Sequence, residues 1–217
     1  MQFESPLTEG VLIKRYKRFL SDIRLINGDT ITAHCPNTGS MLTCSTPGSA
    51  AFLSKSDNPA RKYQYTLEMV KVGQTWVGVN TGRTNKLVAE AIASGFINEF
   101  KNAEKIATER KTSSHTRLDL LVSHEGRSSY IEVKSCSLAI DGCAMFPDAV
   151  TARGTKHLHE LSRLASEGFG AVIFFLVQRM DANRFAPAVH IDPVYSKALT
   201  QAIATGVQLL VYQADVS

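Results

Sequence analysis

Three charged side chains stand inside two apolar segments of the sequence, where a strand would be expected to carry only apolar residues. Asp119 lies within Arg117–Val122, and Glu132 and Lys134 lie within Ser129–Ser135. Burying such charges in a sheet costs on the order of several kcal/mol unless they are paired or bind a metal. These residues therefore indicate either a chemical site or an ion pair.

The two carboxylates could ligate a single divalent cation. Mg²⁺ takes oxygen ligands and usually only one or two protein carboxylates, and water and substrate phosphate complete the coordination. Such a cation lowers the pKa of a bound water and stabilises charge that develops on a phosphodiester. Lys134 and Glu132 are two residues apart and share one face of a strand, so Lys134 would orient that water or neutralise the oxyanion. Together, the two carboxylates and Lys134 predict phosphodiester cleavage that depends on Mg²⁺ or Mn²⁺.

The same residues also fit a purely structural interpretation. Glu132 and Lys134 could form a surface ion pair worth about 0 to 1 kcal/mol, and an Asp followed by Glu-x-Lys is a loose pattern. Glu90, on a predicted helix, could act as an auxiliary acid at the metal. It lies beyond the edge of the apolar face of that helix, so it could equally be solvated.

The elements around these residues predict an α/β domain over residues 83–217. Apolar runs predict strands over 105–111, 117–122, 128–135, 138–146, 171–177 and 208–212, and helical spacing predicts helices over 84–95, 151–167 and 194–204. Thr84 or Asn85 is the expected N-cap of the first helix. The unbroken apolar run Ala171–Val177 is typical of a strand covered on both faces. The pattern indicates a sheet flanked by helices.

The first 82 residues read as short strands separated by turns. The strands are expected over 10–18, 19–26, 30–35, 50–53, 63–72 and 75–79, with Asn27-Gly28-Asp29 as a turn between two of them. Five or six short strands in this length favour a small closed β-barrel. The fold class predicted is therefore a two-part chain, in which a β-barrel precedes a mixed-sheet α/β domain.

Basic residues gather near the start of the predicted barrel. Residues 1–82 hold nine Lys and Arg against six Asp and Glu, and four of the nine lie within five residues. The segment, interleaved with an aromatic residue, consists of Lys14, Arg15, Tyr16, Lys17 and Arg18. Bases and aromatic faces on a barrel suit binding of a nucleic-acid strand. A charged edge strand that resists aggregation would look the same.

Two further segments could hold phosphate. In the loop 36–41, backbone N–H groups could cradle an anion, although a simple β-turn is the alternative; the residues concerned are Asn37, Thr38 and Gly39. The helix predicted over 151–167 has a basic start, where the helix dipole favours anions, and a surface helix is the alternative; the residues there are Arg153, Lys156 and His157.

Composition excludes several classes of protein. The chain has 217 residues, is 44% hydrophobic and 20% charged, and carries a net charge of +4, as is usual for a globular protein. No apolar run approaches the roughly 18 to 20 residues that cross a bilayer, so we expect no membrane partner. The first ten residues lack a basic and apolar signal, which predicts a cytoplasmic location. The four cysteines have no C-x-x-C spacing and are expected to be free thiols.

Several stretches of the chain resemble the bacterial sugar fermentation stimulation family. They are Arg15–Leu20, His34–Met41, Val79–Thr81, Asn85–Ala91, Leu118–Asp119, Glu132–Ser135 and Ala152–Leu158. The resemblance implies an OB-like N-terminal barrel and a C-terminal domain similar to the PD-(D/E)XK nucleases. Carried over by position, the nuclease pattern falls on Glu90, Asp119, Glu132 and Lys134. Leu118 stands where that pattern has a proline.

The resemblance also implies DNA binding that is largely non-specific and a regulatory link to maltose metabolism. Three functions remain open from the sequence. The first is metal-dependent cleavage of DNA or RNA. The second is a DNA-binding regulator of sugar-utilisation genes whose site does not turn over. The third is a sugar or nucleotide enzyme with no nucleic-acid role. The oligomeric state is also open, a homodimer included.

Overall fold

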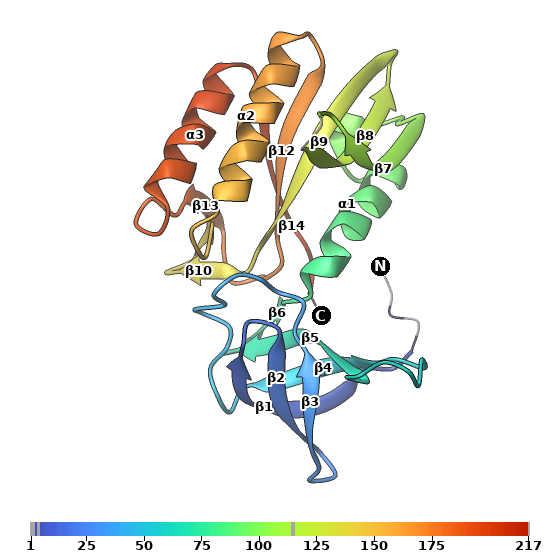
Figure 1. Cartoon of the computed structure of the whole chain (residues 1–217), viewed down its shortest axis with the longest axis vertical. Coiled ribbons are helices and arrows are strands. Elements are labelled where there is room, and N and C mark those ends of the chain that lie inside the picture. Colours follow the sequence, from blue (N-terminus) through green and yellow to red (C-terminus); the bar gives the residue numbers. More distant parts are fainter. Residues whose placement is uncertain (1–2, 4, 114–115, 217) are drawn as a thin grey trace.

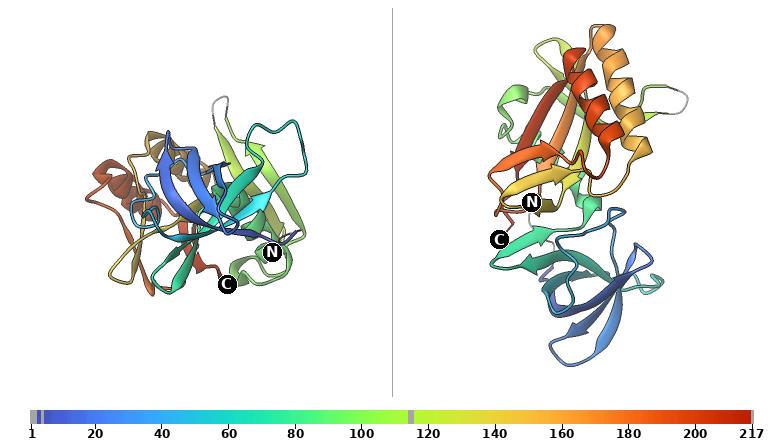
Figure 2. Two further views of the ribbon diagram at one scale, coloured as in Figure 1. Left: turned by 90° about the horizontal axis from the view of Figure 1, so that it is seen from below. Right: turned by 90° about the vertical axis from the view of Figure 1, so that its left-hand side faces the viewer.

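The computed structural model describes residue 3 and residues 5–113 and 116–216. The chain forms two parts that lie one above the other along the long axis of the molecule (Figure 1), and the right-hand view of Figure 2 shows the same arrangement. Within the described ranges no helix has the length and apolar character needed to span a membrane.

The N-terminal part is a closed five-stranded barrel. Its strands are β1 (Thr8–Tyr16), β2 (Leu20–Leu25), β3 (Thr30–His34), β4 (Ala50–Lys55) and β5 (Tyr65–Val72). β1 pairs antiparallel with β2 and β4, and a parallel pair between β3 and β5 closes the ring. Alternate residues point inward, as the period of two in a strand requires, and Leu12, Ile23 and Leu67 are fully buried. A sixth strand, β6 (Thr75–Gly78), extends from β5 toward the second part.

The C-terminal part is built on a mixed five-stranded sheet in the order β14-β12-β9-β8-β7. These strands are β7 (Lys105–Lys111), β8 (Arg117–His124), β9 (Arg127–Cys136), β12 (Gly170–Val177) and β14 (Gln208–Gln213). β12 runs parallel to β9 and β14, whereas β8 is antiparallel to β7 and β9. A smaller sheet contains β10 (Leu138–Ile140), β11 (Cys143–Phe146) and β13 (Arg184–Pro187).

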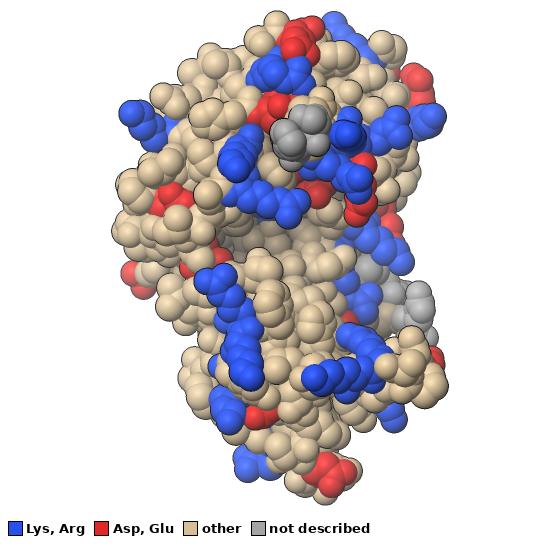
Figure 3. All heavy atoms as spheres, viewed as in Figure 1, with Lys and Arg blue, Asp and Glu red and all other residues tan. Residues whose placement is uncertain are grey.

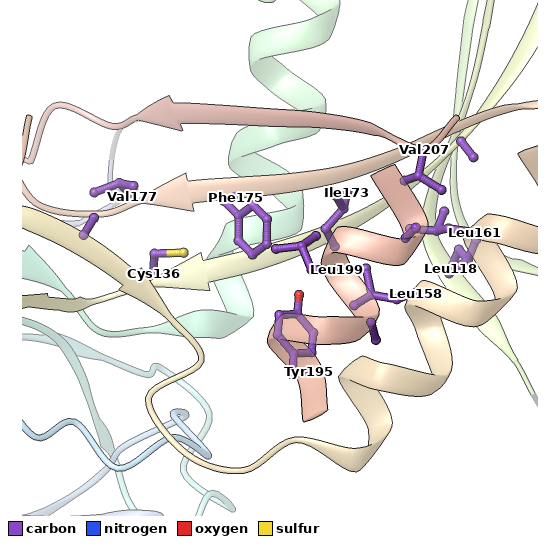
Figure 4. Packing of buried hydrophobic residues seen from close by; sticks show 14 of the residues in the cluster. Leu118, Cys136, Leu158, Leu161, Ile173, Phe175, Val177, Tyr195, Leu199 and Val207 are labelled. Atoms are coloured by element: carbon purple, nitrogen blue, oxygen red, sulfur yellow. The ribbon is translucent and has the colours of Figure 1, made fainter. Parts of the chain in front are cut away.

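Helices cover both faces of the large sheet. Helix α1 (Thr84–Ala93) packs on one face, and α2 (Ala152–Ser166) and α3 (Pro193–Ala204) pack on the other (Figure 1). β12 is buried on both sides, as its apolar run predicts: Phe174 packs on the α1 side and Phe175 on the α2 and α3 side. Figure 4 shows Phe175 with Leu199 and Tyr195 in the layer between the sheet and these two helices.

Three local features differ from the sequence-based expectation. The segment expected as one strand over 138–146 contains two strands, because Asp141 and Gly142 both have positive φ and turn the chain. β13 was not predicted, since its four residues carry no clear alternation. Helix α1 follows a 3₁₀ turn, η1 (Thr81–Arg83), and the side chain of Asn80 accepts the Gly82 N–H there. Neither Thr84 nor Asn85 is therefore the cap.

The two parts meet in a hydrogen-bonded junction. The backbone N–H of Gly78 donates to the carbonyl of Gln178 at 2.8 Å, and Val77 forms an isolated bridge with Arg179. The buried Arg179 guanidinium also donates to Thr43 of the barrel at 3.2 Å. These contacts set the barrel at a defined position beneath the large sheet.

Candidate functional site

A hollow of about 390 Å³ lies between the two parts of the molecule and is lined by both. Most of the chemically active residues singled out in the sequence meet there: Arg18, Asn37, Thr38, Gly39, Asp119, Glu132, Lys134, Arg153 and His157. In Figure 3, Lys and Arg side chains stand on both sides of a hollow between the upper and lower parts. We call this hollow the interdomain groove.

Asp119 is placed where the ladder between β8 and β9 stops. That ladder ends with the pair of Leu120 and Ile131. Beyond it, Oδ2 of Asp119 accepts the Val133 N–H at 2.8 Å, and Oδ1 accepts from the side chain of Asn85 at 2.8 Å. Burial raises the pKa of Asp119, and the charge of Glu132 raises it further. The carboxylate is therefore fixed in direction by two donors.

Glu132 is almost completely buried, with 2% of its surface exposed. Its Oε1 accepts from Lys134 Nζ at 2.6 Å and from Nδ1 of His157. Burial would raise the pKa of Glu132, but the His157 hydrogen bond and the Lys134 charge outweigh it and hold the pKa below its ordinary value. Within the described part of the chain, Oε2 has no hydrogen-bond partner although it is buried. A buried anionic oxygen of this kind is costly unless a cation or a water meets it.

The donor set suits a hard divalent cation. Asp119 and Glu132 are carboxylates that line one groove, and Oε2 of Glu132 is available for a ligand bond. Among the residues that the structure describes, no group of three or more His, Cys, Asp and Glu side chains surrounds one point. Zinc is usually bound by three or four His, Cys, Asp or Glu side chains, whereas Mg²⁺ is held by one or two carboxylates and water. The residues present therefore fit Mg²⁺ or Mn²⁺ better than zinc.

The three basic residues at the start of α2 have three different surroundings. Arg153 is exposed and lines the groove, as a phosphate contact requires. His157 was expected to meet substrate, but it is buried, and its Nε2 accepts from Arg153 at 3.4 Å. With Nε2 accepting, the neutral ring carries its proton on Nδ1 and donates it to Glu132. Lys156 is exposed and is not among the residues that line the groove.

The basic residues of β1 and of the turn that follows it also differ in their surroundings. Arg15 was expected to bind phosphate, but its guanidinium donates to the carbonyls of Arg18, Asn37 and Gly39 at 2.8 Å and of Ser40 at 3.1 Å. It therefore organises the barrel wall of the groove.

Lys14 and Tyr16 lie outside the groove and are engaged with Asp22. The Tyr16 hydroxyl donates to Asp22 at 3.0 Å, and Lys14 Nζ lies 3.5 Å from the same carboxylate. Lys17 is exposed and is not a lining residue either. Of the basic cluster on β1 and its turn, Arg18 is the member that the structure brings to the groove.

The loop 36–41 does not present a vacant phosphate cradle. The Gly39 N–H donates to Asn37 Oδ1 at 2.9 Å, and the Met41 N–H donates to the carboxylate of Asp148 at 3.0 Å. A Cβ at Gly39 would lie 2.2 Å from Asp148 Oδ1, so glycine is required for this close approach. The loop binds an internal carboxylate and ties the barrel to the C-terminal part, while Asn37 and Thr38 still line the groove.

Glu90 is not among the residues that line the groove, so the structure does not bring this acid together with Asp119 and Glu132, and its role as an auxiliary acid stays a prediction. It lines a separate apolar pocket with Phe96 and Tyr212, and its carboxylate is 3.9 Å from Lys86 of the same helix. The residue of α1 that reaches Asp119 is Asn85, five positions earlier. Sequence reasoning missed Asn85 and Asp148. The one available signal was the low helix propensity of an Asn in a first turn.

Replacing Asn85 by Ala should weaken divalent metal binding by about 10- to 100-fold, the usual cost of losing a group that orients a ligand. The variant frees Oδ1 of Asp119 to rotate without removing a ligand. Isothermal titration of Mn²⁺ into both proteins measures the change. Asn85→Asp keeps the size but replaces the donor with a second carboxylate, and unchanged affinity in both variants would contradict the role.

Two family models match almost the whole chain. One, described as the sugar fermentation stimulation protein RE domain, matches residues 82–217, and the other, the SfsA N-terminal OB domain, matches residues 13–79. The chain belongs to the sugar fermentation stimulation protein family. The predicted fold class is confirmed: an OB barrel is followed by a mixed-sheet α/β domain.

The relatives match nearly the whole of this chain. A sugar fermentation stimulation protein homolog of Desulfotalea psychrophila is 57% identical over 100% of this chain and 92% of its own length. The homolog of Geobacter sulfurreducens is 50% identical over 98% of this chain and 91% of its own. A solved structure of Pyrococcus furiosus SfsA in complex with Ca²⁺ superimposes with a TM-score of 0.90 at 25% identity, covering 98% of this chain and 90% of that one.

Proposed function

We propose that this protein is a nuclease that cleaves phosphodiester bonds of nucleic acid, DNA first, with Mg²⁺ or Mn²⁺ in the interdomain groove. One observation carries the proposal. Asp119 and Glu132 line one groove beside Lys134, and the buried Oε2 of Glu132 has no partner within the described residues. A purely structural ion pair gains nothing from such an oxygen, because burial without a partner costs free energy.

Each residue of the groove has a distinct task in this proposal. Asp119 and Glu132 would hold the cation, which when bound supplies an activated water and neutralises charge on the phosphodiester. Lys134 lies 2.6 Å from Glu132 and is partly exposed to the groove, so its ammonium can orient a water or stabilise the charge that develops on the phosphate. His157 and Asn85 keep the two carboxylates in position.

The choice of cation and substrate has independent support. The Pyrococcus furiosus relative was solved with Ca²⁺, which takes oxygen ligands as Mg²⁺ does. Arg18 from the barrel and Arg153 from α2 are both exposed to the groove, and guanidinium groups match phosphate oxygens in geometry. A polymer with phosphates at regular intervals can engage both residues and the cation together.

The second candidate is a DNA-binding regulator of sugar genes, maltose metabolism included, whose site does not turn over. It is favoured by the small ligand set, since no cluster of three metal-ligating side chains is found in the described ranges and Glu90 lies elsewhere. It predicts salt-dependent binding and no product.

The deciding experiment incubates the protein with labelled single-stranded and double-stranded DNA and RNA, with Mg²⁺, with Mn²⁺ and with EDTA. Product that needs metal establishes the nuclease. Binding without product in every metal supports the regulator. Failure to bind any nucleic acid at physiological salt would refute both.

Divalent metal should stabilise the wild-type protein, and Glu132→Gln should abolish that effect. A ligand at 100 times its Kd adds about 2.7 kcal/mol of stability by mass action, or roughly 5 to 10 °C in Tm for a chain of this size. The substituted glutamine keeps the shape of the side chain but lacks the anionic oxygen. Thermal unfolding with and without Mn²⁺ measures this. Glu104→Gln, on an exposed position outside the groove, is the matched control, and an equal shift in the Glu132 variant would refute the site.

A further inference from the structure

The turn between β1 and β2 holds two residues in an unfavourable backbone conformation. Lys17 has φ of 50° and Arg18 has φ of 63°, in the left-handed region that L residues other than Asn and Asp rarely adopt. Neither residue has a side chain suited to this region, and glycine would relieve the strain. Backbone strain that surrounding structure maintains is often found at functional positions.

Arg15 maintains this turn. Its Nη2 donates to the carbonyl of Arg18 at 2.8 Å and to the carbonyls of Asn37 and Gly39, also at 2.8 Å. The turn is thereby tied to the loop that forms the barrel wall of the interdomain groove. The side chain of Arg18 is left exposed and lines the groove. Lys17, one residue earlier, does not line it.

The surroundings of Arg18 suit one strand better than a duplex. The groove volume of about 390 Å³ is in the range of pockets that hold a small ligand. Phe19, which follows Arg18 at the same turn but is not among the residues that line the groove, is a large apolar residue that is 45% exposed. An exposed aromatic face next to a basic residue stacks with an unpaired base, whereas the bases of a duplex already stack on each other.

We propose that Arg18, presented by the strained β1–β2 turn, binds a backbone phosphate of a single nucleic-acid strand in the interdomain groove. The inference rests on the proposed function because it assigns the substrate strand to the same groove. It gives the barrel a direct part in holding the strand beside Asp119 and Glu132.

Lys17→Gly and Arg18→Gly form a matched pair of variants. Each removes one positive charge and one strained φ, so both should raise Tm by about 2 °C if glycine relieves the strain. Affinity is measured by fluorescence anisotropy with a short labelled DNA strand, alone or annealed to its complement, in buffer without divalent metal. Without metal no cleavage is expected to confuse the binding signal.

Arg18→Gly should weaken single-strand binding by about tenfold and lower the slope of log affinity against log salt by about one. Lys17→Gly should change affinity by about twofold or less, because an exposed charge outside the groove is screened. Equal losses in the two variants, or wild-type affinity as high for the duplex as for the strand, would overturn the proposal. A fall of Tm in both variants would overturn the strain that it invokes.

The outcome is separable from that of the proposed function. Protein that shows this contrast between the variants but cleaves nothing with Mg²⁺ or Mn²⁺ would refute the nuclease and support the Arg18 contact. Protein that cleaves with metal but shows equal binding losses in both variants would support the nuclease and refute the Arg18 contact.

Discussion

Asp119→Asn is expected to reduce metal-dependent cleavage by about 10²- to 10⁴-fold. A catalytic metal supplies several kcal/mol of transition-state stabilisation, and each 1.36 kcal/mol is about tenfold in rate. Asn keeps the size of the side chain, and its carbonyl oxygen can still accept the Val133 N–H that Asp119 accepts at 2.8 Å. Its amide nitrogen then faces Asn85, whose own amide has to turn so that its oxygen accepts. With that adjustment the variant should fold normally and lose mainly the negative charge that helps to hold the cation.

The initial rate on a labelled strand, at saturating Mn²⁺, measures the loss. Glu90→Gln is the matched control, since it removes a carboxylate from the same domain at a position that lines another pocket. That control should retain the wild-type rate. Wild-type activity in Asp119→Asn would refute the metal site, and a loss as large in Glu90→Gln would restore the auxiliary acid that the sequence suggested.

Arg83→Ala is expected to lower the free energy of unfolding by about 3 kcal/mol, because it leaves a buried carboxylate without its cation. The side chain of Glu68 is 1% exposed and pairs with Arg83 Nε at 2.7 Å, and a second guanidinium nitrogen donates at 2.9 Å. Ser54 and Asn80 also donate to this carboxylate, at 2.6 and 2.8 Å. Since these two bonds remain and Arg83 is itself 31% exposed, the lower end of the usual 3 to 5 kcal/mol applies.

Urea unfolding of the full chain, followed by circular dichroism, measures this change. The double variant Glu68→Gln with Arg83→Ala should recover much of the loss, because no buried charge then remains and the single amide oxygen of Gln can still accept from one of the two donors, Ser54 or Asn80. A double variant no more stable than Arg83→Ala would show that the loss comes from packing of the arginine and not from the unpaired carboxylate. The pair lies where the barrel meets the start of α1, so the variant tests the junction that places Asn85.

The pattern of apolar residues was enough to predict most of the secondary structure. Residues 171–177 read as a strand covered on both faces, and β12 is buried against helices on both sides of the sheet. The short strands separated by turns over the first 82 residues predicted a small barrel, which β3 and β5 close. Such predictions succeed because a strand or helix that buries one face must repeat its apolar residues with its own period.

The same reasoning located the central acids but not their partners. Asp119, Glu132 and Lys134 stand out because a charge in an apolar strand is costly, a property visible in the chain itself. Asn85 and Asp148 are ordinary polar residues in sequence, and His157 and Arg15 read as surface bases. Their tasks depend on which atom lies within about 3 Å of them, and that follows only from the way distant elements pack.

The sequence by itself determined the two-part fold, the acids of the candidate site and the family to which the chain belongs. Only the tertiary structure decided that Glu90 lies apart while Asn85 meets Asp119, that Arg15 supports the groove while Arg18 lines it, and that Asp148 fills the Gly39 loop. The physical reason is range. Periodicity and burial are set by residues that are neighbours along the chain, whereas the hydrogen bonds that orient a site join residues many positions apart. A local sequence pattern therefore does not show which of several similar side chains will contact the site.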